Sequence, residues 1–116
     1  MNTKYIIFLI LFLLLFLSKV SHAEKLYMLT DKNCLYCMVW EKEIGKIYPK
    51  TDISKQYPLS RVYVNNDIEN LKQKIFNTNL TPTFVFVKDN KEIGRIEGFS
   101  NPEMFWWQVD EIIENY

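Results

Sequence analysis

The hydrophobic pattern divides the chain into a leading segment and a domain. Residues Ile6–Leu17 form an unbroken apolar run of 12 residues after a positive charge at Lys4. The small residues Ser21 and Ala23 then stand at the two positions that a signal peptidase reads. This three-part pattern predicts a secretory signal peptide in residues 1–23, cleaved after Ala23.

An uncleaved membrane anchor is the competing interpretation of the same segment. A helix that spans a bilayer needs roughly 20 apolar residues, more than this run contains. Lys19, directly after the run, is unusual in a signal peptide and keeps the anchor open as an alternative. With either interpretation, residues 24–116 are expected to form a single exported domain.

A strand and a helix are predicted at the start of the domain. The apolar run Leu26–Leu29 and the polar residues 30–33 after it have the pattern of a buried strand followed by a loop. A helix face then follows, with apolar residues at Cys37, Trp40, Ile44 and Ile47. Because the residue before a proline is disfavoured in a helix, Pro49 is expected to end this helix at Tyr48.

The middle of the chain predicts a loop, a strand and a second helix. Residues 49–59 contain two prolines and several polar residues and are expected to be a loop. Alternation over Leu59–Val64 predicts a strand. Asp67 is a candidate N-cap for a helix with apolar residues at Ile68, Leu71 and Ile75.

The last third predicts a hairpin and a terminal helix. Thr83–Val87 is the strongest strand pattern of the chain, and Asp89-Asn90 predicts a tight turn into a second strand over Glu92–Ile96. Ser100–Glu103 has the pattern of a capping box with proline in the first turn. The helix that it opens is expected to bury Phe105, Val109, Ile112 and Tyr116.

The order of these elements defines the fold class. A strand–helix–strand half is followed by a helix and then by a strand–strand–helix half. This order predicts an α/β fold with a mixed central sheet and helices on both faces.

Charge and composition narrow the choice of partners. Without Lys4 and Lys19, the domain has 12 basic against 14 acidic residues, a formal charge of −2. No basic cluster is present that would release counterions from a nucleic acid, so no nucleic-acid partner is expected. A monomer is the default expectation for a domain of this kind.

Cys34 and Cys37 are the two cysteines of the chain, in a C-x-x-C pattern. A bridge across so short a loop constrains the unfolded chain little, which favours a chemical role over a structural one. The pair falls where a loop gives way to a helix, and a helix N-terminus stabilises a thiolate. Cys34 is therefore predicted to have a pKa below the free value of about 8.5 and to attack first. Cys37 is the predicted resolving thiol, which closes a redox-active disulfide.

Metal binding is the alternative use of such a pair. Haem attachment requires a histidine directly after the second cysteine, where this chain has Met38. A closed zinc site needs four ligands, and the one histidine, His22, leaves with the signal peptide. A zinc site would then need a dimer that shares both pairs, whereas a copper carrier needs only two thiolates. We expect no metal and no cofactor, and keep a soft-metal carrier as an alternative.

Thr81-Pro82 directly precedes the strongest strand. Proline is tolerated at the start of a strand because it cannot donate to the ladder. A Thr-Pro-Thr sequence here, downstream of a C-x-x-C pair, matches the cis-proline loop of thioredoxins.

Residues 26–116 resemble the thioredoxin superfamily in the order of their elements, in the C-x-x-C pair and in Thr81-Pro82. Within it they are similar to the small periplasmic proteins of bacterial sulfur-oxidation systems, the SoxS type. The segments that carry this closer resemblance are residues 33–37 with Trp40, 43–51, 58–62, 81–85 and 92–99.

The resemblance implies a periplasmic thiol–disulfide oxidoreductase that keeps a partner protein's cysteine reduced. Cys34 would attack, Cys37 would resolve, and Thr81 and Pro82 would line the groove where the partner's extended backbone pairs. Tyr36 is expected to present an aromatic ring to the substrate. A membrane thiol carrier is the expected electron donor. The closest rival is a thiol oxidant that donates its disulfide to secreted proteins, since the same fold serves both directions.

The chain also departs from the thioredoxin pattern. Leu35-Tyr36 replaces the Gly-Pro of cytosolic thioredoxins, and Met28 stands where they bury an aspartate that moves protons. Water, Glu41 or Glu43 is then expected to take the proton of Cys37. Arg61 lies near the place of a buried lysine of the family, and a plain surface cation is an equal alternative.

Overall fold

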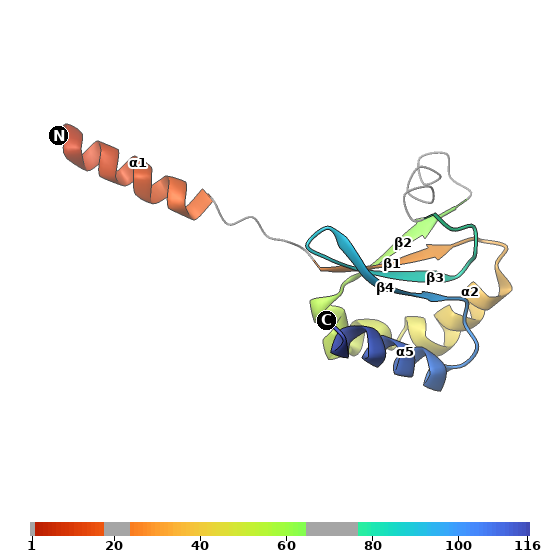
Figure 1. Ribbon diagram of the computed structural model, residues 1–116. Helices are drawn as coiled ribbons and strands as arrows, with labels where there is room; N and C mark the ends of the chain where they lie inside the picture. Colours follow the sequence, from red (N-terminus) through yellow and green to blue (C-terminus); the bar gives the residue numbers. More distant parts are fainter. Residues whose placement is uncertain (1, 18–23, 65–76) are drawn as a thin grey trace.

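A four-stranded mixed sheet forms the centre of the domain in the computed structural model, which describes residues 2–17, 24–64 and 77–116. The strands are β1 (Lys25–Thr30), β2 (Leu59–Tyr63), β3 (Thr83–Lys88) and β4 (Lys91–Glu97). Their order in the sheet is β2-β1-β3-β4 (Figure 1). β1 and β2 are parallel, whereas β3 is antiparallel to both β1 and β4. The predicted α/β class with a mixed sheet is confirmed.

Helices that follow β1 and β4 cover one face of this sheet (Figure 1). They are α2 (Leu35–Trp40), the π-helix η1 (Glu41–Gly45), the 3₁₀-helix η2 (Tyr48–Lys50), α3 (Asp52–Gln56) and α5 (Pro102–Glu114). The helix predicted after Asp67, with Ile68, Leu71 and Ile75, lies outside the described residues. Helices on the second face therefore stay a prediction.

Aromatic side chains dominate the core between the sheet and these helices. The ring of Trp40 lies 5.0 Å from that of Phe84 on β3 and 5.7 Å from that of Phe105 on α5, measured between centroids. The core also contains Leu26, Met28, Ile44, Tyr48, Tyr57, Phe86, Ile96 and Val109. Trp40 thus anchors α2, the helix that contains Cys37, to both β3 and α5.

The helix after Cys37 differs from its prediction in its second half. It widens into the π-helix η1 and ends at Gly45, before Tyr48. A π-turn holds an extra residue, so the side chains after it are rotated relative to an α-helix. Ile47, expected on the buried face, is consequently 53% exposed, while Tyr48 is fully buried.

The prediction of a loop over residues 49–59 was wrong for residues 49–50 and 52–56, which are helical. Pro49 lies inside the 3₁₀-helix η2, where its missing N–H costs nothing at a first turn. The hydroxyl of Thr51 then accepts the backbone N–H of Ser54 and caps α3. A single-turn helix is too short for a hydrophobic period, which is why the pattern missed it.

The C-terminal hairpin and helix agree with most of their predictions. Asp89 and Asn90 both have positive φ, as the tight turn requires. The N-cap of α5 is Asn101 rather than Ser100, because the Asn101 side chain accepts the Met104 N–H at 2.8 Å. Tyr116, predicted to be buried, is 65% exposed because α5 ends at Glu114.

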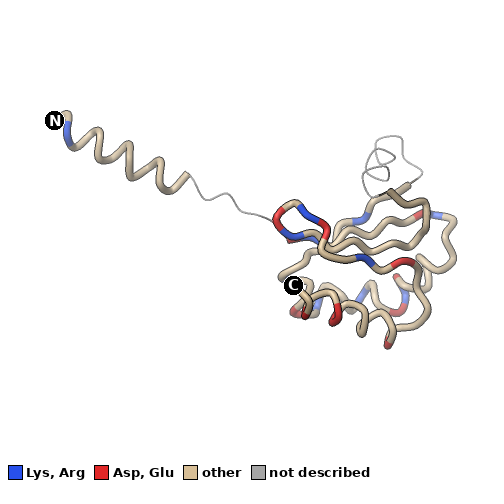
Figure 2. Tube along the Cα trace, in the orientation of Figure 1, with Lys and Arg blue, Asp and Glu red and all other residues tan. Residues whose placement is uncertain are grey.

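The leading helix α1 (Thr3–Leu17) has no buried residue. Its one charge is Lys4, whereas charges of both signs are distributed along the domain (Figure 2). Within the described residues, no helix has both the length and the apolarity needed to cross a membrane. Cleavage after Ala23 stays a prediction.

Replacing Tyr48 with phenylalanine should destabilise the domain by about 1–2 kcal/mol. The Tyr48 hydroxyl donates to the Tyr57 carbonyl at 2.6 Å, and the substitution leaves that buried oxygen unpaired. Urea denaturation measures the loss, with Tyr116→Phe as the matched control on an exposed tyrosine. Equal stability of Tyr48→Phe and the wild type would contradict a stabilising role for the hydrogen bond from Tyr48 to the Tyr57 carbonyl.

The same tyrosine makes stability depend on alkaline pH. Burial raises the pKa of Tyr48, and the neighbouring Tyr57 raises it further. The protonated Tyr48 hydroxyl therefore stabilises the fold fully at pH values below the unfolded-state pKa of about 10. This stabilisation is lost as the pH rises through the higher pKa of the folded state. Tyr48→Phe should flatten the fall of stability above about pH 10.

Candidate active site

A short turn after β1 places the cysteine pair at the start of a helix. The Asp31 side chain accepts the Asn33 N–H at 3.0 Å, and the Asp31 carbonyl accepts the Cys34 N–H at 3.2 Å. Cys34 is then the N-cap of α2, with its sulfur accepting the Cys37 N–H at 3.1 Å. An N–H directed at this sulfur favours the thiolate form once the pair is reduced.

Cys34 and Cys37 form a disulfide. Cys34 is partly exposed, whereas Cys37 is 2% exposed. A partner's sulfur can reach Cys34 from solvent, while Cys37 is accessible chiefly to Cys34. This asymmetry fits the predicted order of attack by Cys34 and resolution by Cys37.

The Thr81-Pro82 loop lies at the same end of the sheet as the cysteines. Leu29 of β1 pairs with Thr83 of β3, so the same register brings Pro82 opposite Thr30, the last residue of β1. The Thr81–Pro82 peptide bond is cis, as the resemblance implied. Pro82 is buried and its carbonyl accepts the Gly98 N–H at 2.8 Å, whereas Thr81 is partly exposed. Their contact with substrate stays a prediction.

Exposed apolar side chains follow Cys34 in the chain. Leu35, Tyr36 and Met38 are 63%, 61% and 54% exposed. The surface position predicted for Tyr36 therefore agrees with the structure, and its role in substrate binding stays a prediction. Exposed apolar residues on the first turn of α2 can contact a partner's chain at little desolvation cost.

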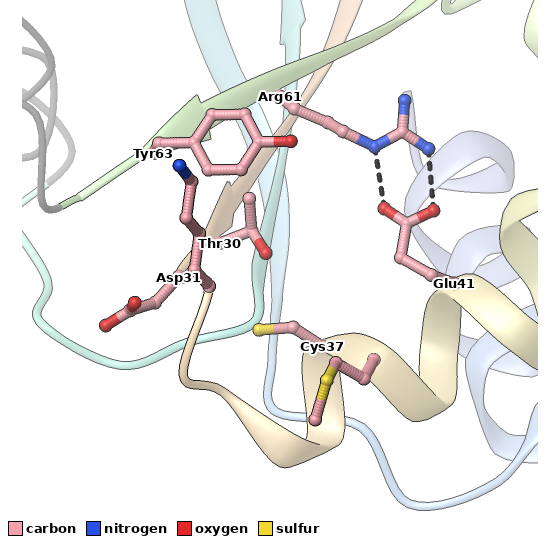
Figure 3. Close-up of a pocket in the computed structure, with 8 residues that line it drawn as sticks. Thr30, Asp31, Cys37, Glu41, Arg61 and Tyr63 are labelled. Atoms are coloured by element: carbon pink, nitrogen blue, oxygen red, sulfur yellow. Dashed lines mark hydrogen bonds and ion pairs between the residues drawn. The ribbon is translucent and has the colours of Figure 1, made fainter.

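A pocket of about 630 Å³ opens beside Cys37 (Figure 3). It is lined by Thr30, Asp31, Lys32, Cys37, Met38, Glu41, Arg61 and Tyr63. Within it, Arg61 donates from Nε and Nη2 to the two carboxylate oxygens of Glu41, at 2.6 and 2.8 Å. This hydrogen bonding raises the pKa of Arg61 against the opposing effect of burial.

The structure separates the candidates for the proton acceptor. Met28 is fully buried in the core, so a thioether occupies the place of the thioredoxin aspartate. Glu41 lines the pocket with Cys37, whereas Glu43 is exposed and is not among the lining residues. Arg61 is exposed, as the surface-cation alternative expected, and it pairs with Glu41.

Thr30, Lys32 and Tyr63 also line the pocket, and the sequence patterns did not single them out. They follow or end strands β1 and β2, which are parallel, so their carboxyl ends meet at one edge. Sites often lie at the carboxyl ends of parallel strands, so the residues at the ends of the two predicted strands could have been chosen as candidates from the sequence. In the described parts of the chain, no group of three or more His, Cys, Asp or Glu is placed to hold a metal ion.

A mixed sheet with a C-x-x-C disulfide at the start of a helix defines a thiol–disulfide oxidoreductase. A family model described as a thioredoxin-like domain matches residues 17–113. The chain belongs to this thioredoxin-like family.

Solved structures agree with the family. The periplasmic thioredoxin SoxS from Paracoccus pantotrophus, in its reduced form, is 28% identical with a TM-score of 0.65, and the match covers 78% of this chain and 96% of that one. Thioredoxin-2 of a malaria parasite is 16% identical with a TM-score of 0.63, covering 80% of this chain and 86% of that one. The latter match shows the fold alone. No curated protein sequence matches the chain. The predicted resemblance to the thioredoxin superfamily and to SoxS is confirmed.

Proposed function

We propose that the protein is a periplasmic reductase that keeps a cysteine of a partner protein in its reduced form. The observation that carries this proposal is the similarity to a periplasmic thioredoxin over nearly the whole of that protein, with 96% covered. The partly exposed Cys34 beside the buried Cys37 supports it, because this arrangement suits attack on a partner's disulfide.

The reaction transfers two electrons from the cysteine pair to the partner. The Cys34 thiolate attacks one sulfur of the partner's disulfide, which forms a mixed disulfide and releases the other sulfur as a thiolate. Cys37 then loses its proton and attacks the Cys34 sulfur. The bond between Cys34 and the partner breaks, the second partner sulfur leaves as a thiolate, and the Cys34–Cys37 disulfide remains.

Substrate docking is proposed at the end of the sheet that carries the cysteines. An extended segment of the partner would pair with backbone near Thr81 and Pro82, while the ring of Tyr36 contacts its side chains. A membrane thiol carrier is proposed to return two electrons to the disulfide after each turnover. A role in sulfur oxidation is proposed from the similarity to SoxS.

Disulfide donation is the second candidate function, and one observation favours it. The Cys37 N–H at 3.1 Å from the Cys34 sulfur stabilises the reduced thiolate, which makes the oxidised pair a stronger oxidant. The two functions use the same chemistry in opposite directions. The reduction potential of the pair decides between them.

Equilibration of residues 24–116 with dithiothreitol and glutathione buffers, followed by alkylation of free thiols, measures this potential. A reductase should give a value near the roughly −270 mV of thioredoxin. A value near the roughly −120 mV of a strong periplasmic oxidant would instead favour disulfide donation. Bound metal at stoichiometric level in reduced protein, without thiol exchange, would favour the soft-metal carrier.

A further inference from the structure

The buried cysteine needs a route for its proton. In the proposed function, Cys37 attacks as a thiolate, yet its side chain is only 2% exposed. The thioether of Met28, in the core behind it, cannot accept a proton. Cys37 lines the pocket of about 630 Å³, so an acceptor for its proton is to be sought among the other residues of that pocket.

Glu41 is the carboxylate that the helix places on this pocket together with Cys37. The two residues are four apart, a spacing that puts residues on one side of a helix, and both line the pocket. In Figure 3 the Glu41 carboxylate points toward Arg61. Arg61, from β2, holds both carboxylate oxygens and so fixes the orientation of the group. The pocket has room for bridging water, and its charged and polar side chains offer such water hydrogen-bond partners.

Gly45 contributes to the same arrangement. A Cβ atom at this buried position would collide with Oε2 of Glu41 and would lie 3.5 Å from the ring of Trp40. The absence of a side chain therefore leaves the space that the carboxylate occupies. A side chain at this position would require the Glu41 carboxylate, the end of a flexible side chain, to move.

The other charged groups around the pocket fit the role less well. The Asp31 carboxylate points away from Cys37 in Figure 3. Lys32 and Tyr63 also line the pocket. A lysine cation has no free lone pair for a proton, and a neutral phenol is a weaker base than a carboxylate.

We propose that Glu41, positioned by Arg61, takes up the proton of the Cys37 thiol across this pocket. The inference rests on the proposed roles of the two cysteines. The Cys37 S–H bond breaks as its proton passes through water to the Glu41 carboxylate. The sulfur then attacks Cys34, the bond from Cys34 to the partner breaks, and the departing partner thiolate takes up a proton from solvent.

Reaction of the reduced protein with dithiobis(nitrobenzoate) in a stopped-flow instrument separates the two steps. Attack by Cys34 releases the first thionitrobenzoate at a rate proportional to the reagent concentration. Resolution by Cys37 releases the second at a rate that does not depend on the reagent. The pH profile of this second phase reports the deprotonation of Cys37.

Glu41→Gln preserves the shape of the side chain and an acceptor for Arg61, and it removes the base. We expect the second phase to slow by about 10-fold to 100-fold near neutral pH, with the first phase within about twofold of wild type. The rates should converge at high pH, where Cys37 is already ionised. Arg61→Gln should also slow the second phase, and Arg61→Lys should restore part of the rate.

Two matched controls separate this role from a general effect of lost charge. Glu43→Gln removes an exposed carboxylate from the same helical segment. Glu92→Gln removes the carboxylate of the second bidentate pair, in which Arg95 binds Glu92 on β4, outside the pocket. Both controls should keep wild-type rates in both phases.

An unchanged second phase in Glu41→Gln would overturn the inference. A faster one would also overturn it, because it would mean that the released Arg61 cation simply stabilises the Cys37 thiolate. Release of a single thionitrobenzoate by the wild type would be a different failure, since it would refute the proposed resolving role of Cys37.

Discussion

Replacing Cys34 with serine should abolish the acceleration that this protein gives to the reduction of insulin disulfides by dithiothreitol, a loss of at least about 10³-fold in the catalysed rate above background. A hydroxyl has neither the acidity nor the nucleophilicity of a thiol at neutral pH, and the buried Cys37 cannot replace the outer sulfur. The turbidity of the released insulin chains measures the rate.

Cys37→Ser is the matched variant, because it leaves the first step intact and removes the second. It should accumulate mixed disulfides with substrate through Cys34, visible as a mass increase that dithiothreitol reverses. Trapping by Cys34→Ser at the same level would show that the two roles are assigned in the wrong order.

Replacing Trp40 with alanine should destabilise the domain by about 3–5 kcal/mol. Trp40 is fully buried, and its ring packs at 5.0 Å from Phe84 and at 5.7 Å from Phe105. The cavity left by removal of the indole would lie between the sheet, α2 and α5. Urea denaturation of the oxidised protein measures the change in the unfolding free energy.

Trp40→Phe should cost much less than Trp40→Ala. The buried indole N–H finds no hydrogen-bond partner among the described residues, so its removal relieves an unpaired donor while the ring contacts are partly kept. Trp107→Ala provides the control, because Trp107 is 58% exposed and should change stability by about 0.5 kcal/mol or less. Equal losses for Trp40 and Trp107 would contradict the described core.

Hydrophobic periodicity correctly predicted the strands and helices whose side chains form the core. The strand Thr83–Lys88 is buried over its first four residues, and an uninterrupted apolar run is the direct consequence of such burial. Trp40 and Ile44 were assigned to the buried helix face for the same reason. The prediction failed at Ile47, where the π-turn rotates the helix face in a way that apolar spacing does not reveal.

The chemistry of the site was partly visible in the sequence. The C-x-x-C pair and Thr81-Pro82 are local motifs, so their residues can be read directly from the chain. The Glu41–Arg61 pair joins residues 20 apart and depends on the register between β1 and β2. No local pattern contains that register, so Glu41 and Glu43 were equal candidates until the structure placed only Glu41 on the pocket.

The N-cap position of Cys34 couples the folding equilibrium to electron transfer. The sulfur that reacts also accepts the Cys37 N–H at the start of α2, so we expect the strength of this capping bond to differ between the two redox forms. A thermodynamic cycle then equates the difference in unfolding free energy between the two redox forms with a shift in potential, about 30 mV for each 1.4 kcal/mol. Two denaturation curves, one for each form, therefore measure how far the fold moves the potential of the pair from that of the unfolded chain.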